Sequence, residues 1–193
     1  LQVVANPADR REVVGTVETV DPGKIDTLVQ RARAGASAWG ARSTDERAAI
    51  LDRAAELFEE NTARLLGITV REAGKSLPNA VAELREAVDF LRYYAAEIRQ
   101  LGSQAECRPL GVIACISPWN FPLAIFTGQV AAALAAGNAV LAKPAEETPL
   151  VAAEAVRLMH AAGVPDDALI FTPGAGDVGA ALTAAPDAVS YTH

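Results

Sequence analysis

Residues 111–144 read GVIACISPWNFPLAIFTGQVAAALAAGNAVLAKP, and their order of apolar and turn-forming residues decides the fold class. Residues 112–116 and 139–142 are short, continuous apolar runs, which is typical of strands buried on both faces of a parallel sheet. Between them, residues 122–136 form an apolar, alanine-rich segment of helical length, and Gly137 follows as its expected end. The stretch therefore predicts a strand–helix–strand unit.

The same alternation continues towards the C-terminus. Residues 147–163 are predicted to form a helix that ends at Gly163, and residues 168–174 contain a third strand. A short helix over 175–185 and the opening of a fourth strand at 187–190 follow. This pattern predicts an α/β fold with a Rossmann-like, doubly wound parallel sheet, in which ligands bind beyond the carboxyl ends of the strands.

The N-terminal half has a different pattern. Residues 1–23 alternate apolar and polar positions and predict one or two short strands. Helical spacing of apolar residues predicts a helix over 24–38, a second that starts at a Ser43–Glu46 capping box and continues to a break near residue 72, and a third over 79–100. A helical N-terminal segment thus leads into the sheet.

Composition narrows the class of protein. The 193 residues are 51% hydrophobic and 21% charged, which is typical of a globular protein with a core. The net charge of −7 and the lack of a basic block argue against nucleic-acid and membrane partners. Cys107 and Cys115 stand without a CxxC or a paired His, so no disulfide scaffold and no metal site are expected. No signal peptide is visible, and we expect a cytoplasmic protein.

Asn120 is the first candidate site residue. It follows a predicted strand, and Pro118 and Pro122 stiffen the chain on both sides of it. A carboxamide N–H held in place beforehand is what an oxyanion-binding site needs. The alternative is that Asn120 caps the helix that follows.

Lys143 and Glu146 follow the second predicted strand. Lys143 could bind sugar hydroxyls or phosphate, and Glu146 could accept a hydrogen bond from a ribose hydroxyl. A carboxylate there would repel a 2′-phosphate, which favours NAD over NADP. The alternative is that Lys143 is solvated and that Glu146 and Glu147 lie in the first turn of a helix, where the helix dipole favours them.

The third candidate segment is a Gly-x-Gly-x-x-Gly motif at Gly174, Gly176 and Gly179, between a predicted strand and a predicted helix. No acidic residue follows at the usual distance. The segment could be a phosphate cradle, a backbone wall against an adenine, or a flexible turn.

Three stretches together resemble the aldehyde dehydrogenase superfamily, and most closely the L-glutamate γ-semialdehyde dehydrogenase module of bifunctional proline-utilisation proteins. They are REAGKSLPNAVAELREAVDFLRYYA (71–95), CISPWNFPLAIFTGQVAAALAAGNAVLAKPAEETPL (115–150) and IFTPGAGDVG (170–179). The resemblance implies a truncated aldehyde dehydrogenase fold, an aldehyde substrate and NAD as cofactor. It also implies roles for single residues. Asn120 would stabilise the oxyanion, and Ile116, Pro118 and Trp119 would line the cofactor cleft. Lys143 and Glu146 would bind the adenosine ribose, and Gly176 and Gly179 would lie near the adenine.

The sequence also departs from the family pattern. The contexts of the nucleophilic Cys and the base Glu are absent, and Cys107 and Cys115 are interpreted as structural. We therefore expect a fragment that is inactive alone, with residues 1–106 and 107–188 as two parts of one NAD-binding domain and 189–193 as a non-native tail. The parent would be a homo-oligomer and could be fused to a proline dehydrogenase domain. A non-catalytic module or another aldehyde substrate are the alternatives.

Overall fold

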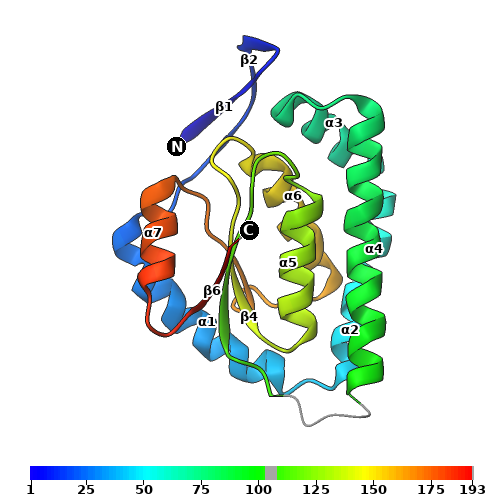
Figure 1. Cartoon of the computed structure of the whole chain (residues 1–193), viewed down its shortest axis with the longest axis vertical. Coiled ribbons are helices and arrows are strands. Elements are labelled where there is room, and N and C mark those ends of the chain that lie inside the picture. Colours follow the sequence, from blue (N-terminus) through cyan, green and yellow to red (C-terminus); the bar gives the residue numbers. More distant parts are fainter. Residues whose placement is uncertain (103–107, 193) are drawn as a thin grey trace.

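The computed structural model describes residues 1–102 and 108–192, and it is organised around a parallel sheet with helices on both faces (Figure 1). In the described part of the chain this sheet has four strands in the order β5-β4-β3-β6. The strands are β3 (Val112–Ile116), β4 (Ala139–Lys143), β5 (Leu169–Phe171) and β6 (Val189–Thr192). The predicted α/β class and parallel sheet are confirmed.

The connecting helices explain why the sheet is doubly wound. The helices α5 (Ala124–Ala135) and α6 (Pro149–Ala162) connect β3 to β4 and β4 to β5, and they pack on one face. The chain then returns through α7 (Gly176–Ala184) on the opposite face to place β6 on the other side of β3. The reversal creates a topological switch point between β3 and β6, which is where such sheets bind ligands.

Alternating side chains of β3 join two separate cores. Ile113 and Cys115 belong to the core under α5 and α6, whereas Val112 and Ala114 belong to the core under α7 and α1 (Ile25–Gly40). Because successive side chains of a strand point to opposite faces, a strand covered on both sides must be apolar throughout. This is the physical reason for the continuous apolar run in the sequence.

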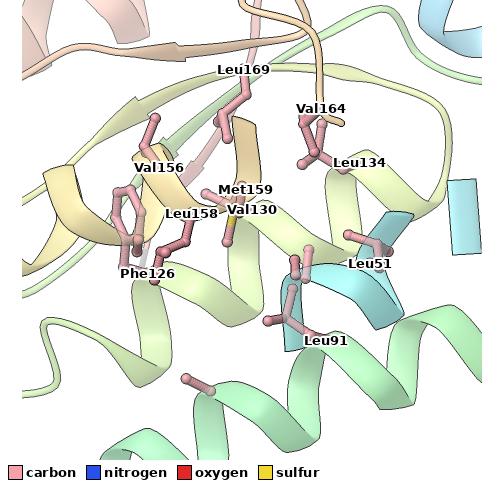
Figure 2. Close-up of a cluster of buried hydrophobic side chains, with 14 of the residues drawn as sticks. Leu51, Leu91, Phe126, Val130, Leu134, Val156, Leu158, Met159, Val164 and Leu169 are labelled. Atoms are coloured by element: carbon pink, nitrogen blue, oxygen red, sulfur yellow. The ribbon is translucent and has the colours of Figure 1, made fainter. Parts of the chain in front are cut away.

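The N-terminal helices extend the larger core. The helices α2 (Thr44–Glu60) and α4 (Leu77–Leu101) pack against α5, and α3 (Thr62–Ala73) packs against α4 and α6. Figure 2 shows side chains from α2, α4, α5 and α6 meeting in one cluster, among them Leu51, Leu91 and Phe126. Each of these three is fully buried, which stabilises the fold by about 1.5–3 kcal/mol per side chain.

One helix boundary differs from the prediction. The Ser43–Glu46 capping box starts α2 as predicted, but the single helix expected beyond it is two helices, with Asn61 between them. Asn61 has φ −101° and ψ 20°, outside the helical region, and its side-chain amide donates to the Leu57 carbonyl at 2.8 Å. The side chain therefore competes with the backbone and ends α2.

The remaining elements agree with the expected local structure. β1 (Gln2–Asn6) and β2 (Asp9–Val17) form an antiparallel pair, and the short 3₁₀ helix η1 (Pro22–Lys24) leads into α1. Gly137 and Gly163 follow α5 and α6 with φ of 88° and 115°, a conformation that glycine adopts without strain. The division at residues 106, 107 and 188, and the origin of the last five residues, stay predictions.

Candidate functional site

The three predicted site segments lie at the same edge of the sheet. The Ser117 N–H, directly after β3, donates to the carbonyl of Lys143 at 3.1 Å. A Cβ atom on Gly179 would lie 3.4 Å from Cε of Lys143, so the backbone of α7 passes beside the lysine side chain. Residues far apart in sequence are thereby brought together at the carboxyl ends of β3 and β4.

Lys143 is the central charge of this edge. The residue is only 6% exposed, so the alternative of a solvated lysine is wrong. Its ammonium group donates to the neighbouring Pro144 carbonyl at 3.1 Å. Burial lowers the pKa of Lys143, and the nearby carboxylates of Glu146, Glu147 and Asp177 oppose that effect. A buried ammonium in a partly acidic site is suited to binding hydroxyl groups.

Glu146 and Glu147 are not first-turn residues of a helix. The helix α6 begins at Pro149 with Thr148 as its N-cap, and no acidic residue lies in its first turn. The second alternative for this segment is therefore also wrong. Both glutamates are solvent-exposed in the loop after β4, so the carboxylate of Glu146 is accessible to a ligand hydroxyl.

The three glycines of the Gly-x-Gly-x-x-Gly motif differ in their surroundings. A Cβ on Gly174 would lie 2.3 Å from a methyl carbon of Val178, so a side chain there is excluded by close packing. A Cβ on Gly176 would meet nothing within 4 Å, which leaves open space beside the first turn of α7. The predicted role of Gly176 and Gly179 near an adenine stays a prediction, and the open space is compatible with it.

Asn120 lies in the loop between β3 and α5, and it does not cap the helix. The N-cap of α5 is Leu123, and no side chain of the N-cap residue closes that helix. Asn120 is exposed, and within the described part of the chain its carboxamide has no hydrogen-bond partner. The capping alternative is wrong, and the amide donors are open to solvent at the switch-point side of the sheet.

The other residues predicted to line a cofactor cleft surround this loop. Ile116 ends β3 and is half-buried, as is Pro118, whereas Trp119 has 57% of its surface exposed. The carbonyl of Ile116 accepts from the side-chain amide of Gln129 at 3.4 Å, which fixes the end of the strand to α5. The structure thus places all three on the predicted edge; their contact with a cofactor stays a prediction.

Sequence reasoning missed Glu83, which holds the first turn of α5. Glu83 lies on α4 and is 1% exposed, and its Oε2 accepts from the N–H groups of Leu123 at 2.8 Å and Ala124 at 3.2 Å. Its other carboxylate oxygen forms an ion pair with Lys75. The available signal was spacing, because Glu83 shares the buried helix face of Ala80 and Ala87.

A second missed glutamate, Glu72 on α3, holds the first turn of α6 in the same manner. Its two carboxylate oxygens accept from the N–H groups of Leu150 at 2.6 Å and Val151 at 2.9 Å. Glu72 is buried, and burial raises its pKa to about 7, although the two backbone hydrogen bonds act in the opposite direction. Its signal was likewise its position on the buried face of Leu65 and Thr69.

Cys115 has the properties of a structural cysteine. It is 1% exposed within β3, and burial raises the pKa of its thiol to about 12. A thiol with that pKa is protonated at neutral pH and is a poor nucleophile. Cys107 lies outside the described residues.

Two further findings concern the described residues only. Residues 1–102 and 108–192 contain no group of three or more His, Cys, Asp or Glu side chains that could hold a metal ion. Over the same ranges, every helix is too short or too polar to cross a membrane.

The fold and the site define an α/β domain with a Rossmann-like parallel sheet, and at its switch point an amide donor is exposed and has no hydrogen-bond partner among the described residues. The family model described as "Aldehyde dehydrogenase family" matches residues 2–192. The chain belongs to the aldehyde dehydrogenase family.

Similar proteins within this family confirm the resemblance that was predicted from the sequence. The chain is 57% identical over 187 residues to the bifunctional protein PutA of Rhizobium meliloti, covering 97% of this chain and 15% of that protein. It is 40% identical over 186 residues to the 1-pyrroline-5-carboxylate dehydrogenase of Anoxybacillus flavithermus, covering 90% and 36% respectively. The chain therefore spans about a seventh of the PutA relative and about a third of the dehydrogenase.

The comparison of structures agrees. The crystal structure of a 1-pyrroline-5-carboxylate dehydrogenase from Thermus with bound NAD matches with a TM-score of 0.92 at 34% identity, over 96% of this chain and 39% of that one. The crystal structure of a bifunctional proline utilization A protein matches with a TM-score of 0.86 at 48% identity, over 90% and 19%.

Proposed function

We propose that this chain is the NAD-binding part of an NAD-dependent L-glutamate γ-semialdehyde dehydrogenase, which oxidises that aldehyde to L-glutamate in proline breakdown. The observation on which the proposal rests is the exposed carboxamide of Asn120, which has no hydrogen-bond partner among the described residues. It lies in the loop after β3, and the first residue of that loop, Ser117, is hydrogen-bonded to the carbonyl of the buried Lys143 of β4. The similarity to 1-pyrroline-5-carboxylate dehydrogenases and to PutA proteins supports the substrate.

The residues present fit a bound NAD. Among the described residues the ammonium group of Lys143 donates only to the Pro144 carbonyl, so it keeps further N–H donors for ribose hydroxyls, while the exposed Glu146 supplies an acceptor. A Cβ on Gly176 would meet no atom within 4 Å, so the space beside the start of α7 would be open to a ligand. NAD supplies the acceptor for a hydride, and these residues would hold its adenosine half.

Asn120 would act on the substrate. A thiolate that attacks the aldehyde carbon forms a thiohemiacetal with a negatively charged oxygen, and the Asn120 carboxamide would donate to that oxygen. Cys115 is buried with a raised pKa, and Cys107 is interpreted from the sequence as structural, so the nucleophile would come from a part of the parent protein outside this chain. We expect this chain alone to be inactive as an aldehyde dehydrogenase.

The parent protein is proposed to act on a small-molecule aldehyde, with no nucleic-acid or membrane partner. The similarity to bifunctional PutA proteins supports a fusion to a proline dehydrogenase domain. A homo-oligomeric state and a cytoplasmic location complete the proposal.

The test uses the full-length parent enzyme. With L-glutamate γ-semialdehyde and NAD, Asn120→Ala should lower kcat by roughly 100- to 1000-fold, because one oxyanion donor is lost. The KM for NAD should stay unchanged, since Asn120 is not among the ribose ligands. Lys143→Met should do the reverse and raise mainly the KM for NAD. Wild-type kcat in Asn120→Ala would contradict the role of the amide, and an absence of NADH formation by the wild-type enzyme would contradict the proposed function.

A further inference from the structure

Among the residues that the structure describes, none forms a hydrogen bond with the Asn120 side chain, so the position of its carboxamide depends on the loop around it. This loop, residues 117–123, is fixed at its start by the hydrogen bond from Ser117 N–H to the Lys143 carbonyl. Its end enters α5 through Pro122 and Leu123, which are buried. An oxyanion donor must be in place before charge develops, and a displacement of about 1 Å can cost roughly 100-fold in rate.

Two side chains from the N-terminal helical region act at the far end of this loop. Glu83 accepts from the N–H groups of Leu123 and Ala124, which would otherwise have no partner at the start of α5. Lys75 forms an ion pair with Glu83 and places its Nζ 4.2 Å from the centre of the Phe121 ring. Lys75 and Glu83 thus contact the residue after Asn120 and the two residues that begin the helix.

The burial of the Lys75–Glu83 ion pair strengthens its interaction. The side chain of Glu83 is fully buried and that of Lys75 is 14% exposed, so water competes little with their interaction. A helix N-terminus stabilises a carboxylate, and the carboxylate in turn fixes the helix start. The cation over the Phe121 ring orients that ring, and Phe121 is bonded directly to Asn120.

We propose that Glu83, together with Lys75, is a positioning residue for the oxyanion-binding amide of Asn120; this inference rests on the proposed function. Glu83 itself touches no substrate. It acts by fixing the first turn of α5 and, through Lys75 and Phe121, the side of the loop that presents the carboxamide.

The kinetic test uses Glu83→Gln in the full-length enzyme, which keeps the shape and removes the charge. We expect kcat to fall roughly 10- to 100-fold with an unchanged KM for NAD. In an Asn120→Ala background the same substitution should cause no further loss, because the group that it positions is gone. Wild-type kcat in Glu83→Gln, or a full additional loss in the Asn120→Ala background, would overturn the proposal.

A matched control separates positioning from stability. Glu154 on α6 is also a buried carboxylate, 5% exposed, and it is paired with Arg64 and Arg157 at 2.7 Å, but it forms no hydrogen bond or ion pair with residues 117–123. Glu154→Gln should lower the free energy of unfolding and leave kcat unchanged. A loss of kcat in this control equal to that in Glu83→Gln would overturn the positioning role.

A second readout needs no activity. The chain has two tryptophans, Trp119 in the loop and the buried Trp39, whose indole N–H donates to the Leu134 carbonyl at 2.9 Å. With 5-fluorotryptophan incorporated, the ¹⁹F resonance of Trp119 should shift or broaden in Glu83→Gln, while that of Trp39 stays unchanged. An unchanged Trp119 resonance would overturn the proposal even if the parent enzyme proved to have another function, so the two failures are distinguishable.

Discussion

The first turns of α5 and α6 are held alike, but the two glutamates that hold them differ in their electrostatic surroundings. Each glutamate lies on an N-terminal helix and accepts from two backbone N–H groups of a helix that follows a site loop. Glu83 is paired with Lys75, whereas Glu72 has no ion-pair partner among the described residues. The comparison shows that a buried carboxylate can accept the same two backbone hydrogen bonds whether an ion pair neutralises its charge, as for Glu83, or not, as for Glu72.

The difference has a physical consequence for each loop. Removing one member of a buried ion pair leaves the other charge desolvated, so the start of α5 depends on two residues at once. At the start of α6 only burial and hydrogen bonds act on Glu72, and burial prevails, which raises its pKa to about 7. We therefore expect the stability that the start of α5 provides to depend on both members of the ion pair, and the stability that the start of α6 provides to depend on pH.

The largest expected effect is the loss of Glu83. Glu83→Ala should lower the free energy of unfolding by about 3–5 kcal/mol, because Lys75 is left without its partner and two N–H groups lose their acceptor. Urea unfolding followed by far-UV circular dichroism measures this. Adding Lys75→Met should recover part of the loss, since it removes the uncompensated charge. No recovery in the double variant would show that the ion pair is not the source of the difference.

The next effect concerns pH and Glu72. Its pKa is about 7 in the folded chain against an ordinary value of 4.5, so between these values the folded state binds more protons than the unfolded state. Stability from this group is therefore complete at low pH and is lost as pH rises through the folded pKa, by roughly 3 kcal/mol in total. In Glu72→Gln this loss should be absent.

The measurement compares urea unfolding at about pH 5 and about pH 8 for wild type and Glu72→Gln. The free energy of unfolding of wild type should fall relative to that of Glu72→Gln as the pH increases. Parallel pH profiles for the two proteins would contradict an uncompensated charge at α6 and would make the two helix starts equivalent.

The smallest effect tests a cap that is made locally. At the start of α2, the Glu46 N–H donates to the Ser43 hydroxyl at 3.2 Å, and the Ser43 N–H donates to the Glu46 carboxylate at 2.8 Å. Ser43→Ala should cost about 1 kcal/mol in the free energy of unfolding. A cost as large as that of Glu83→Ala would remove the contrast between a local cap and a cap supplied by another helix.

Most of the fold could be predicted from the sequence because its signals are local. The apolar runs of β3 and β4, the glycines after α5 and α6, and the Ser43–Glu46 box all act within a few residues, and each prediction agrees with the structure. The break at Asn61 was missed because apolar spacing continues across it to Leu65, and only the side-chain hydrogen bond of Asn61 shows where α2 ends.

The candidate site was predictable in part. The residue types at the three strand ends indicated Asn120, Lys143 and Glu146, because polar groups directly after buried strands meet at one sheet edge. The sequence could not decide between these site roles and the structural alternatives, which were a helix cap for Asn120, a solvated side chain for Lys143 and a first-turn position for Glu146. The position of a helix start, two to three residues away from each, decides whether Asn120 or Glu146 is a cap, and helix boundaries are the least certain part of sequence reasoning.

The sequence by itself thus determined the class of fold, the family resemblance and the position of the polar segments along the chain. Only the tertiary structure decided that Lys143 is buried, that the exposed Asn120 does not cap α5, and that Glu83 and Glu72 hold the first turns of α5 and α6. The physical reason is the range of the interactions. Periodicity and local capping depend on neighbours within one helical turn, whereas the hydrogen bonds from Glu83 and Glu72 to the helix starts join residues 40 to 79 positions apart, which the folded chain alone brings into contact.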